Sequence, residues 1–133
     1  MQSHPLRPLV FCGPSGSGKS TLVKRLMDDF PDKFGFTVSH TTRLPRAGEV
    51  HGQHYYFTDE NAIREAIERG EFIEHAVFSG NVYGTSFKAV EDITKKGKVV
   101  IMDIDTQGVQ QVKKTSLNPW FVFIQPPNLQ ELR

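Results

Sequence analysis

The chain has 133 residues, of which 38% are hydrophobic and 23% are charged, and its formal net charge is +1. This composition is that of an ordinary globular domain and excludes an intrinsically disordered chain. The near balance of charge gives no general argument for nucleic acid or an acidic membrane surface as a partner, so we expect neither. The single cysteine, Cys12, excludes an internal disulfide and favours a reducing, cytoplasmic compartment. The apolar runs are strand-sized and the first residues lack the apolar core of a signal peptide, so we expect no membrane span.

Short apolar runs alternate along the chain with stretches of helical periodicity. Four runs are predicted to be strands: Leu9–Cys12 and 99–105, which we expect to be buried, and Phe72–Phe78 and 120–125. Four stretches are predicted to be helices: 19–30, 59–69, a segment from Phe87 that ends before Gly97, and a short segment that contains Val109 and Val112. Strands that alternate with helices predict an α/β fold with a mostly parallel, doubly wound sheet. Residues from about 36 to 86 are richer in turns, aromatic residues and mixed charge, and we interpret them as a smaller inserted lobe.

The clearest motif is GPSGSGKST, which begins at Gly13. It fits G-x-x-x-x-G-K-[ST] with Gly13, Gly18, Lys19 and Ser20. It also follows a predicted strand and opens a predicted helix, which distinguishes a phosphate-binding loop from a chance glycine-rich turn. The glycines let several backbone N–H groups point at one phosphate, and the helix N-terminus adds positive potential. We expect Lys19 to reach the outer phosphates of a nucleoside triphosphate and Ser20 to bind Mg²⁺.

Two aspartates, Asp103 and Asp105, end the apolar run VVIMDID. P-loop proteins place a carboxylate near the metal at the end of a buried strand. Asp105 precedes a predicted helix and could equally be its N-cap. Asp103 lies within the end of the strand and is harder to explain as a cap, so it is the better candidate for the metal side.

Two arginines three residues apart, Arg43 and Arg46, precede the adjacent tyrosines Tyr55 and Tyr56 in the stretch TTRLPRAGEVHGQHYYF. Guanidinium groups suit phosphate because they present paired donors in one plane. A second anion site apart from the P-loop would imply a second phosphorylated ligand, and therefore a kinase instead of a hydrolase that transfers the phosphoryl group to water. The alternative is a solvated loop with scattered charge, which these residues alone do not exclude.

The strand FIEHAVF carries an acid, Glu74, among apolar residues. Period-2 alternation places Glu74 on the same face as three neighbours, Phe72, Ala76 and Phe78. A carboxylate on such a face needs a partner. It could accept two N–H donors from a planar base such as guanine, or it could form an internal salt bridge, and Glu74 alone does not decide. The following SGNVYGTS, with Tyr83 and Thr85, could be part of a site or a simple hairpin turn.

Five segments stand in the same order as in guanylate kinases: GPSGSGKST, FGFTVSHTTRLPRAGEVHGQHYYF, FIEHAVFSGNVYGTS, VVIMDIDTQGV and QPP. From about residue 8 to residue 133 the chain resembles that family, in particular its eukaryotic cytosolic branch. The resemblance implies a P-loop nucleoside monophosphate kinase fold, with a parallel core in 1–35 and 87–133 and a GMP-binding lobe in 36–86. It implies a cytoplasmic, monomeric enzyme that moves the γ-phosphoryl group of ATP to GMP, and to dGMP, with Mg²⁺.

The resemblance also implies roles for individual residues. ATP would be bound by Gly13, Gly16, Ser17, Gly18, Lys19, Ser20 and Thr21. GMP would be bound by Ser39, Arg43, Arg46, Tyr55, Glu74, Tyr83, Thr85 and Asp103. Within these sets the catalytic residues would be Lys19, Arg43 and Arg46, and the metal side would be Ser20 and Asp103. Glu74 and Thr85 match the residues that read the guanine edge. Tyr55 is expected to touch the phosphate and Tyr56 to pack beneath the lobe, since neighbours in a strand face opposite ways.

The sequence ends at PPNLQELR, where the family continues into a lid and the last core elements. We expect a fragment that keeps much of the GMP-binding lobe but has lost most of its catalysis, because the lid supplies arginines to the transferring phosphate. The alternative function is a non-catalytic guanylate-kinase-like module that binds phosphorylated peptides. Such modules usually have an eroded P-loop, whereas this loop is intact.

Overall fold

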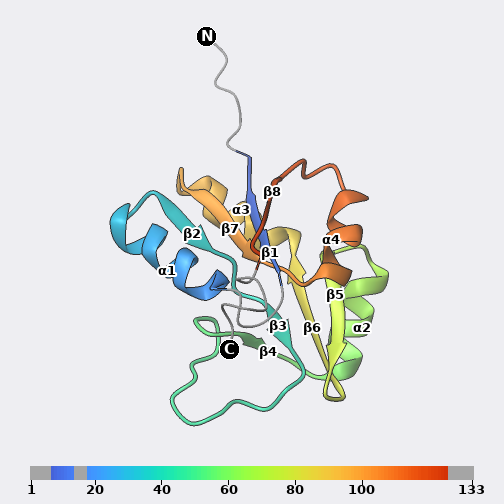
Figure 1. Cartoon of the computed structure of the whole chain (residues 1–133). Coiled ribbons are helices and arrows are strands. Elements are labelled where there is room, and N and C mark those ends of the chain that lie inside the picture. The colour runs from blue at the N-terminus through green and yellow to red at the C-terminus, as the bar shows by residue number, and fades with distance from the viewer. Residues whose placement is uncertain (1–6, 14–17, 126–133) are drawn as a thin grey trace, which may run out of the picture.

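The computed structural model describes residues 7–13 and 18–125, which form two β-sheets and four α-helices (Figure 1). The elements are β1 (Leu9–Cys12), α1 (Lys19–Asp29), β2 (Phe34–Phe36), β3 (His40–Thr41), β4 (Tyr56–Phe57), α2 (Glu60–Glu68), β5 (Phe72–Phe78), β6 (Asn81–Ser86), α3 (Phe87–Lys95), β7 (Val99–Asp103), α4 (Thr106–Lys113) and β8 (Trp120–Phe123). All predicted strands and helices are present, with ends that differ by a few residues. Four further short strands, β2, β3, β4 and β6, were not predicted.

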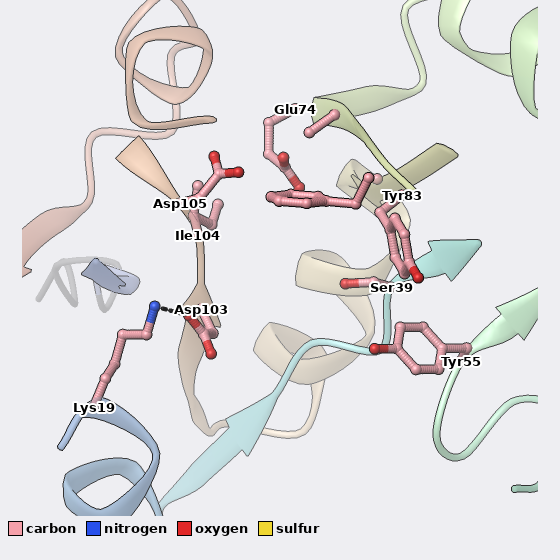
Figure 2. Close-up of a pocket in the computed structure, with 11 residues that line it drawn as sticks. Lys19, Ser39, Tyr55, Glu74, Tyr83, Asp103, Ile104 and Asp105 are labelled. Atoms are coloured by element: carbon pink, nitrogen blue, oxygen red, sulfur yellow. Dashed lines mark ion pairs between the residues drawn. The ribbon is translucent and has the colours of Figure 1, made fainter. Parts of the chain in front are cut away.

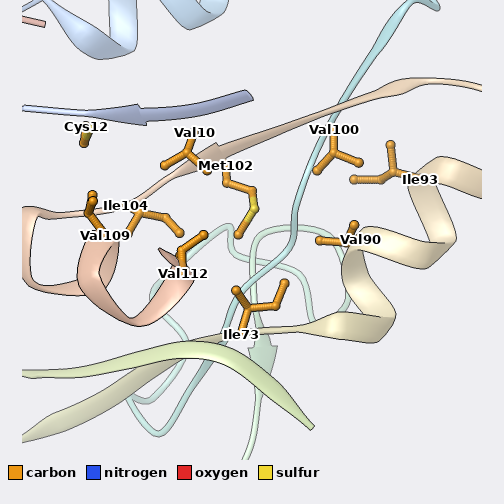
Figure 3. Close-up of a cluster of buried hydrophobic side chains, with 10 residues drawn as sticks. All are labelled: Val10, Cys12, Ile73, Val90, Ile93, Val100, Met102, Ile104, Val109 and Val112. Carbon is orange, nitrogen blue, oxygen red and sulfur yellow. The ribbon is translucent and has the colours of Figure 1, made fainter. Parts of the chain in front are cut away.

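The first sheet has the strand order β2-β7-β1-β8, and every pair in it is parallel. Side chains of β1 and β7 alternate between its two faces. Phe11 and Ile101 pack on one face with Val23 of α1. On the other face, a larger buried cluster joins β1 and β7 to α3 and α4 (Figure 3). The predicted parallel α/β sheet with helices on both faces is therefore confirmed.

The second sheet has the order β4-β3-β6-β5 and mixes parallel and antiparallel pairs. All four strands lie within residues 36–86, the segment predicted to form the inserted lobe. The helix α2 joins β4 to β5 and is capped at its N-terminus by Asp59, whose side chain accepts a hydrogen bond from Ala62 N. That this segment moves as a lobe stays a prediction.

An irregularity in β5 changes which side chains share a face. The pairing with β6 shifts register between Phe72 and Glu74, so Ile73 is the extra residue of a β-bulge. Glu74 still lies with Ala76 and Phe78 along one cavity, as the alternation predicts. The prediction was wrong for Phe72, which precedes the bulge and lines a different cavity beside His40.

The bulge also joins the second sheet to the core. Ile73 is 3% exposed and belongs to the buried cluster formed by the first sheet, α3 and α4, as Figure 3 shows. Next to it, the side-chain amide of Gln111 on α4 pairs with the backbone of His75: Nε2 donates to the carbonyl oxygen at 2.8 Å, and Oε1 accepts from N–H at 3.0 Å. Strand β5 is therefore held against α4 by the packing of Ile73 and by the two hydrogen bonds of Gln111.

In the part of the chain that the structure describes, no helix is both long and apolar enough to cross a membrane.

We expect Ile73→Ala to lower the free energy of unfolding by about 2–5 kcal/mol, because it leaves a cavity in the shared core. Val77→Ala is the matched control on the same strand, since Val77 is 65% exposed, and should change it by less than about 0.5 kcal/mol. Urea denaturation measures both. Equal small effects would contradict the role of Ile73 in joining the two sheets.

Candidate functional site

A cavity of about 410 Å³ lies between the ends of the parallel strands and the second sheet (Figure 2). Its lining residues are Lys19, Ser39, Tyr55, Glu74, Ala76, Phe78, Tyr83, Gly84, Asp103, Ile104 and Asp105. Six of the residues predicted from the sequence to bind nucleotide meet here, from both sheets and from α1. They are Lys19, Ser39, Tyr55, Glu74, Tyr83 and Asp103.

One wall of the cavity comes from the P-loop and β7. Lys19 Nζ lies 2.8 Å from Asp103 Oδ1 and donates to the Gly13 carbonyl oxygen at 3.2 Å (Figure 2). Gly18 is the N-cap of α1 with a left-handed φ of 91°, which glycine adopts without steric cost. Ser20 and Thr21 are exposed in the first helical turn. The predicted ATP-binding residues Gly16 and Ser17 lie outside the described residues.

Gly13, the first residue after β1, lies directly against the backbone of Ile124. A side chain at this position would place its Cβ 2.4 Å from the carbonyl oxygen of Ile124, and its φ is 154°. Only glycine fits there.

The opposite wall carries the carboxylate of Glu74, which is hydrogen-bonded to the hydroxyl of Thr85. Thr85, 3% exposed, donates from Oγ1 to Glu74 Oε1 at 2.8 Å. Burial raises the pKa of the Glu74 carboxyl, and the negative charge of Asp105 adds to that increase, while the hydrogen bond from Thr85 opposes it. The sequence suggested an internal salt bridge as the alternative partner of Glu74, and the described residues contain none.

Asp105 combines a helix cap, which the sequence suggested, with a place in the cavity. Its Oδ1 caps α4 by accepting from Gly108 N at 2.8 Å, and its side chain also lines the cavity beside Glu74 (Figure 2). Gly108 permits this approach, because a Cβ there would lie 2.4 Å from Ile104 Cγ2 and 3.1 Å from Glu74 Oε2. The cap is confirmed, and the place of Asp105 in the cavity was missed.

A third group of cavity residues presents hydroxyl groups. Ser39, Tyr55 and Tyr83 surround one end of the cavity in Figure 2, and the two tyrosine rings meet edge to face with centroids 6.0 Å apart. Tyr56 turns away and packs on the ring of His40 at 4.9 Å. The expected division of the two tyrosines is therefore present in the structure, while their contacts with a phosphate stay a prediction.

Neither of the two arginines predicted to bind phosphate lines this cavity, but Arg43 lies against Tyr55, which does line it. Arg43 places its guanidinium 5.2 Å from the centre of the Tyr55 ring and forms a two-pronged ion pair with Glu49, at 2.9 and 3.0 Å. Arg46 is exposed. The guanidinium of Arg43 and the backbone N–H of Arg46 lower the pKa of Glu49 to about 2, and Glu49 in turn raises the pKa of Arg43. Glu49 was missed, although its place three residues after Arg46 in a turn-rich segment was a usable signal.

The predicted metal side consists of Ser20 and Asp103. Hydroxyl and carboxylate oxygens are the ligands that Mg²⁺ prefers, and Mg²⁺ keeps several waters when proteins bind it, so two protein ligands suffice. Asp103 is paired with Lys19 and would have to share its carboxylate with the ion. Among residues 7–13 and 18–125, no group of three or more His, Cys, Asp or Glu side chains could hold a metal by itself. The residues present fit a nucleotide-borne Mg²⁺ ion.

The parallel sheet, the glycine loop that leads into α1 and the Lys19–Asp103 pair together define a P-loop α/β protein. A family model described as guanylate kinase matches residues 5–133. Over 126 residues, which are 95% of this chain, it is 51% identical to the guanylate kinase of Sus scrofa and 50% identical to that of Homo sapiens. A crystal structure of guanylate kinase from Anaplasma phagocytophilum superimposes with a TM-score of 0.71 at 34% identity, covering 98% of this chain and 65% of that one. The chain belongs to the guanylate kinase family.

The chain is shorter than these relatives. The matched part makes up 64% of the Sus scrofa and Homo sapiens proteins and 33% of guanylate kinase 1 of Oryza sativa, to which the chain is 52% identical.

The raised pKa of Glu74 predicts that its charge destabilises the free protein. An acid whose pKa is higher in the folded than in the unfolded chain contributes most to stability when protonated, and that contribution is lost as the pH rises through its folded pKa. We expect Glu74→Gln, which removes the charge, to raise the free energy of unfolding at pH 7 by about 1 kcal/mol. The gain should disappear in acid, where Glu74 itself is protonated. Urea denaturation from pH 4 to 8 measures this, and a destabilised variant at pH 7 would contradict it.

A second cavity, of about 210 Å³, lies beneath the second sheet beside His40 and α2. His40 Nδ1 is buried and has no hydrogen-bond partner among the described residues. Burial lowers the pKa of His40, the neighbouring His51 lowers it further, and Glu71 opposes both. A histidine with a lowered folded pKa contributes stability that is complete above its unfolded pKa, about 6.5, and is lost as the pH falls through the folded value.

We therefore expect the wild-type chain to lose stability between pH 7 and pH 5 relative to His40→Phe, which cannot take up the proton. His75→Asn, at an exposed position of β5, is the control and should follow the wild type. Thermal denaturation across this range tests the expectation, and parallel curves for wild type and His40→Phe would contradict it.

Proposed function

We propose that this chain provides the nucleotide-binding parts of an enzyme that phosphorylates GMP, and also dGMP, to the diphosphate, with ATP as the donor and Mg²⁺ as the ion. One observation carries the proposal: a single cavity is lined both by the P-loop pair Lys19–Asp103 and by Glu74, whose carboxylate accepts a hydrogen bond from Thr85 behind it. The first pair suits a triphosphate, and the second suits the N–H edge of a base. A P-loop hydrolase would need only the first.

The acceptor base would lie against the wall formed by Glu74 and Asp105. Guanine presents two adjacent N–H groups on one edge, and a carboxylate accepts both with its two oxygens. Adenine presents an acceptor at the corresponding ring nitrogen, so it would leave a buried carboxylate oxygen without a donor. The hydroxyl of Thr85, held on Glu74 Oε1, fixes the orientation of the carboxylate.

The acceptor phosphate would lie toward Ser39, Tyr55 and Tyr83, with Arg43 and Arg46 behind them. Hydroxyl groups can donate to phosphate oxygens, and guanidinium groups add charge and paired donors. Arg43 is already beside the Tyr55 ring. The two arginines do not line the open cavity, so the loop that carries them would have to approach the phosphate when GMP binds.

The donor phosphates would lie along the P-loop and the N-terminus of α1, where backbone N–H groups and Lys19 neutralise their charge. Ser20 and Asp103 would hold Mg²⁺, which would supply positive charge against the charge that develops during transfer. Phosphoryl transfer depends mainly on alignment and charge neutralisation. The chain's contribution is to hold the two phosphates at opposite sides of one cavity. Movement of residues 36–86 toward the core would then exclude water, which would otherwise accept the phosphoryl group.

The single cysteine supports a cytoplasmic location for this enzyme. A monomeric state remains a prediction.

The test measures binding first, because the matched relatives are longer than this chain. Isothermal titration of the 133-residue chain should show that GMP binds at least tenfold more tightly than AMP, CMP or UMP, and Glu74→Gln should remove most of that preference. Glu60→Gln, which alters an exposed ion pair with Arg64 outside the cavity, is the control and should keep it. A coupled assay with ATP and GMP then measures transfer. Equal binding of GMP and AMP would contradict the guanine site, and tight binding of a phosphoserine peptide without GMP binding would favour the interaction module instead.

A further inference from the structure

The guanidinium of Arg43 uses only part of its donor set within the protein. Arginine has five N–H donors, arranged as an end edge between Nη1 and Nη2 and a side edge between Nε and Nη2. The end edge binds Glu49, with Nη1 to Oε1 at 2.9 Å and Nη2 to Oε2 at 3.0 Å. Nη1 also donates to the Leu44 carbonyl oxygen at 3.1 Å. Among the described residues Nε makes no hydrogen bond of ordinary geometry, although the side chains of Tyr83 and Tyr55 lie near enough to the guanidinium to raise its pKa. No carboxylate within residues 7–13 and 18–125 occupies the side edge, so its two donors stay available to a phosphate.

The carboxylate of Glu49 does more than pair with one arginine. Its Oε1 also accepts from Arg46 N at 2.8 Å, and Glu49 N donates to the Arg46 carbonyl oxygen at 3.0 Å. Glu49 therefore holds the segment 43–49 through three groups: the guanidinium of Arg43, the backbone N–H of Arg46 and the carbonyl oxygen of Arg46. Any change in Glu49 acts on the guanidinium of Arg43 and on the backbone of Arg46 together.

The start of this turn is fixed to the second sheet. Arg43 N donates to the Oγ1 of the fully buried Thr41 at 3.1 Å. Thr42 N donates to the Val82 carbonyl oxygen at 3.0 Å, and Thr42 Oγ1 accepts from Val82 N at 2.9 Å. The Cα position of Arg43 is therefore set by β6, and the direction of its long side chain is set mainly by Glu49.

This ion pair is far less exposed than the pair between Arg64 and Glu60 on α2. The side chains of Arg43 and Glu49 are only 12% and 19% exposed, whereas those of Arg64 and Glu60 are 63% and 61% exposed. Exposed pairs within one helix contribute little and hold no fixed geometry. A two-pronged pair that is shielded from water fixes a guanidinium plane. Glu49 also lines a cavity of about 310 Å³ that adjoins the nucleotide cavity and shares Ser39, Tyr55 and Asp103 with it.

We propose that Glu49 is a positioning residue for the acceptor phosphate: it binds the end edge of Arg43 and holds the side edge, Nε and Nη2, beside Tyr55 as the donor pair for that phosphate. This inference rests on the proposed function, because the phosphate belongs to GMP. Glu49 itself does not touch the ligand. It stays on Arg43 when GMP binds, so that the arginine meets the phosphate in an orientation set beforehand.

The competing arrangement is one in which Glu49 blocks the site. A phosphate could displace the carboxylate and take the end edge of Arg43 for itself. The two arrangements predict opposite signs for one substitution. If Glu49 positions Arg43, removing its charge weakens GMP binding; if Glu49 competes with the phosphate, removing its charge strengthens it.

The experiment is isothermal titration of the 133-residue chain and its variants with GMP and with guanosine, which lacks the phosphate. We expect Glu49→Gln to weaken GMP binding about tenfold, because the amide keeps one acceptor and loses the two-pronged pair. Guanosine binding should change by less than about twofold, since Glu74 and Thr85 are untouched. Glu49→Asp keeps the charge but is one methylene shorter, and should fall between wild type and Glu49→Gln. Glu60→Gln is the control and should match the wild type with both ligands.

The outcomes separate the proposal from a purely structural role. A selective loss for GMP supports it. An equal loss for GMP and guanosine, with a lower melting temperature, would overturn it, because Glu49 would then only stabilise the loop. Unchanged or tighter GMP binding would also overturn it. If the wild-type chain binds guanosine and GMP equally, the phosphate site of the proposed function fails first, which distinguishes that failure from a failure of Glu49 alone.

Discussion

The contact between strand β5 and helix α4 is the constraint on which the rest of the site depends. The β-bulge at Ile73 turns that side chain into the core, where it packs with α3 and α4. The next residue is Glu74, whose carboxylate is thereby brought to the start of α4 beside Asp105. Gln111 fixes the backbone of the residue after it. Of three successive residues in β5, Ile73 therefore packs in the core, Glu74 faces the cavity and His75 fixes the register through its backbone. A shift of one residue would exchange these positions.

The contact between β5 and α4 also brings two carboxylates together, those of Glu74 and Asp105, and this does not stabilise the fold. Glu74 and Asp105 lie on one wall, and the only cation that lines the cavity, within residues 7–13 and 18–125, is Lys19, which is already paired with Asp103. Burial without a cation raises the pKa of Glu74 and costs stability. A pair of acids kept in such a place is explained by a ligand that brings N–H donors. A folded protein with no ligand for this wall would be more stable with an amide there.

The sequence predicted the parts of the molecule that depend on short-range pattern. The P-loop could be recognised because its glycines, lysine and serine occupy neighbouring positions, and the strands β1, β5 and β7 because their apolar residues are contiguous. Period-2 alternation separated Tyr55 from Tyr56. It failed at Phe72, because a bulge adds one residue without leaving a mark in the hydrophobic pattern. The two-residue strands β3 and β4 are too short to show any periodicity, and they are defined by their pairing with each other and by the pairing of β3 with β6.

The position of Glu49 shows a different limit of sequence reasoning. Its role depends on a turn that brings residues 43, 46 and 49 together. From the sequence alone, a charged loop of this kind is predicted to be exposed to solvent. The structure shows the turn closed by backbone and side-chain hydrogen bonds from within the chain itself. Long side chains lose considerable rotamer freedom when a ligand orders them, and an arginine ordered in advance avoids part of that cost at binding. The charge balance agrees with this, because two arginines and one glutamate leave a single net positive charge. That charge attracts a phosphate. The ion pair with Glu49 also reduces the repulsion between the guanidinium groups of Arg43 and Arg46.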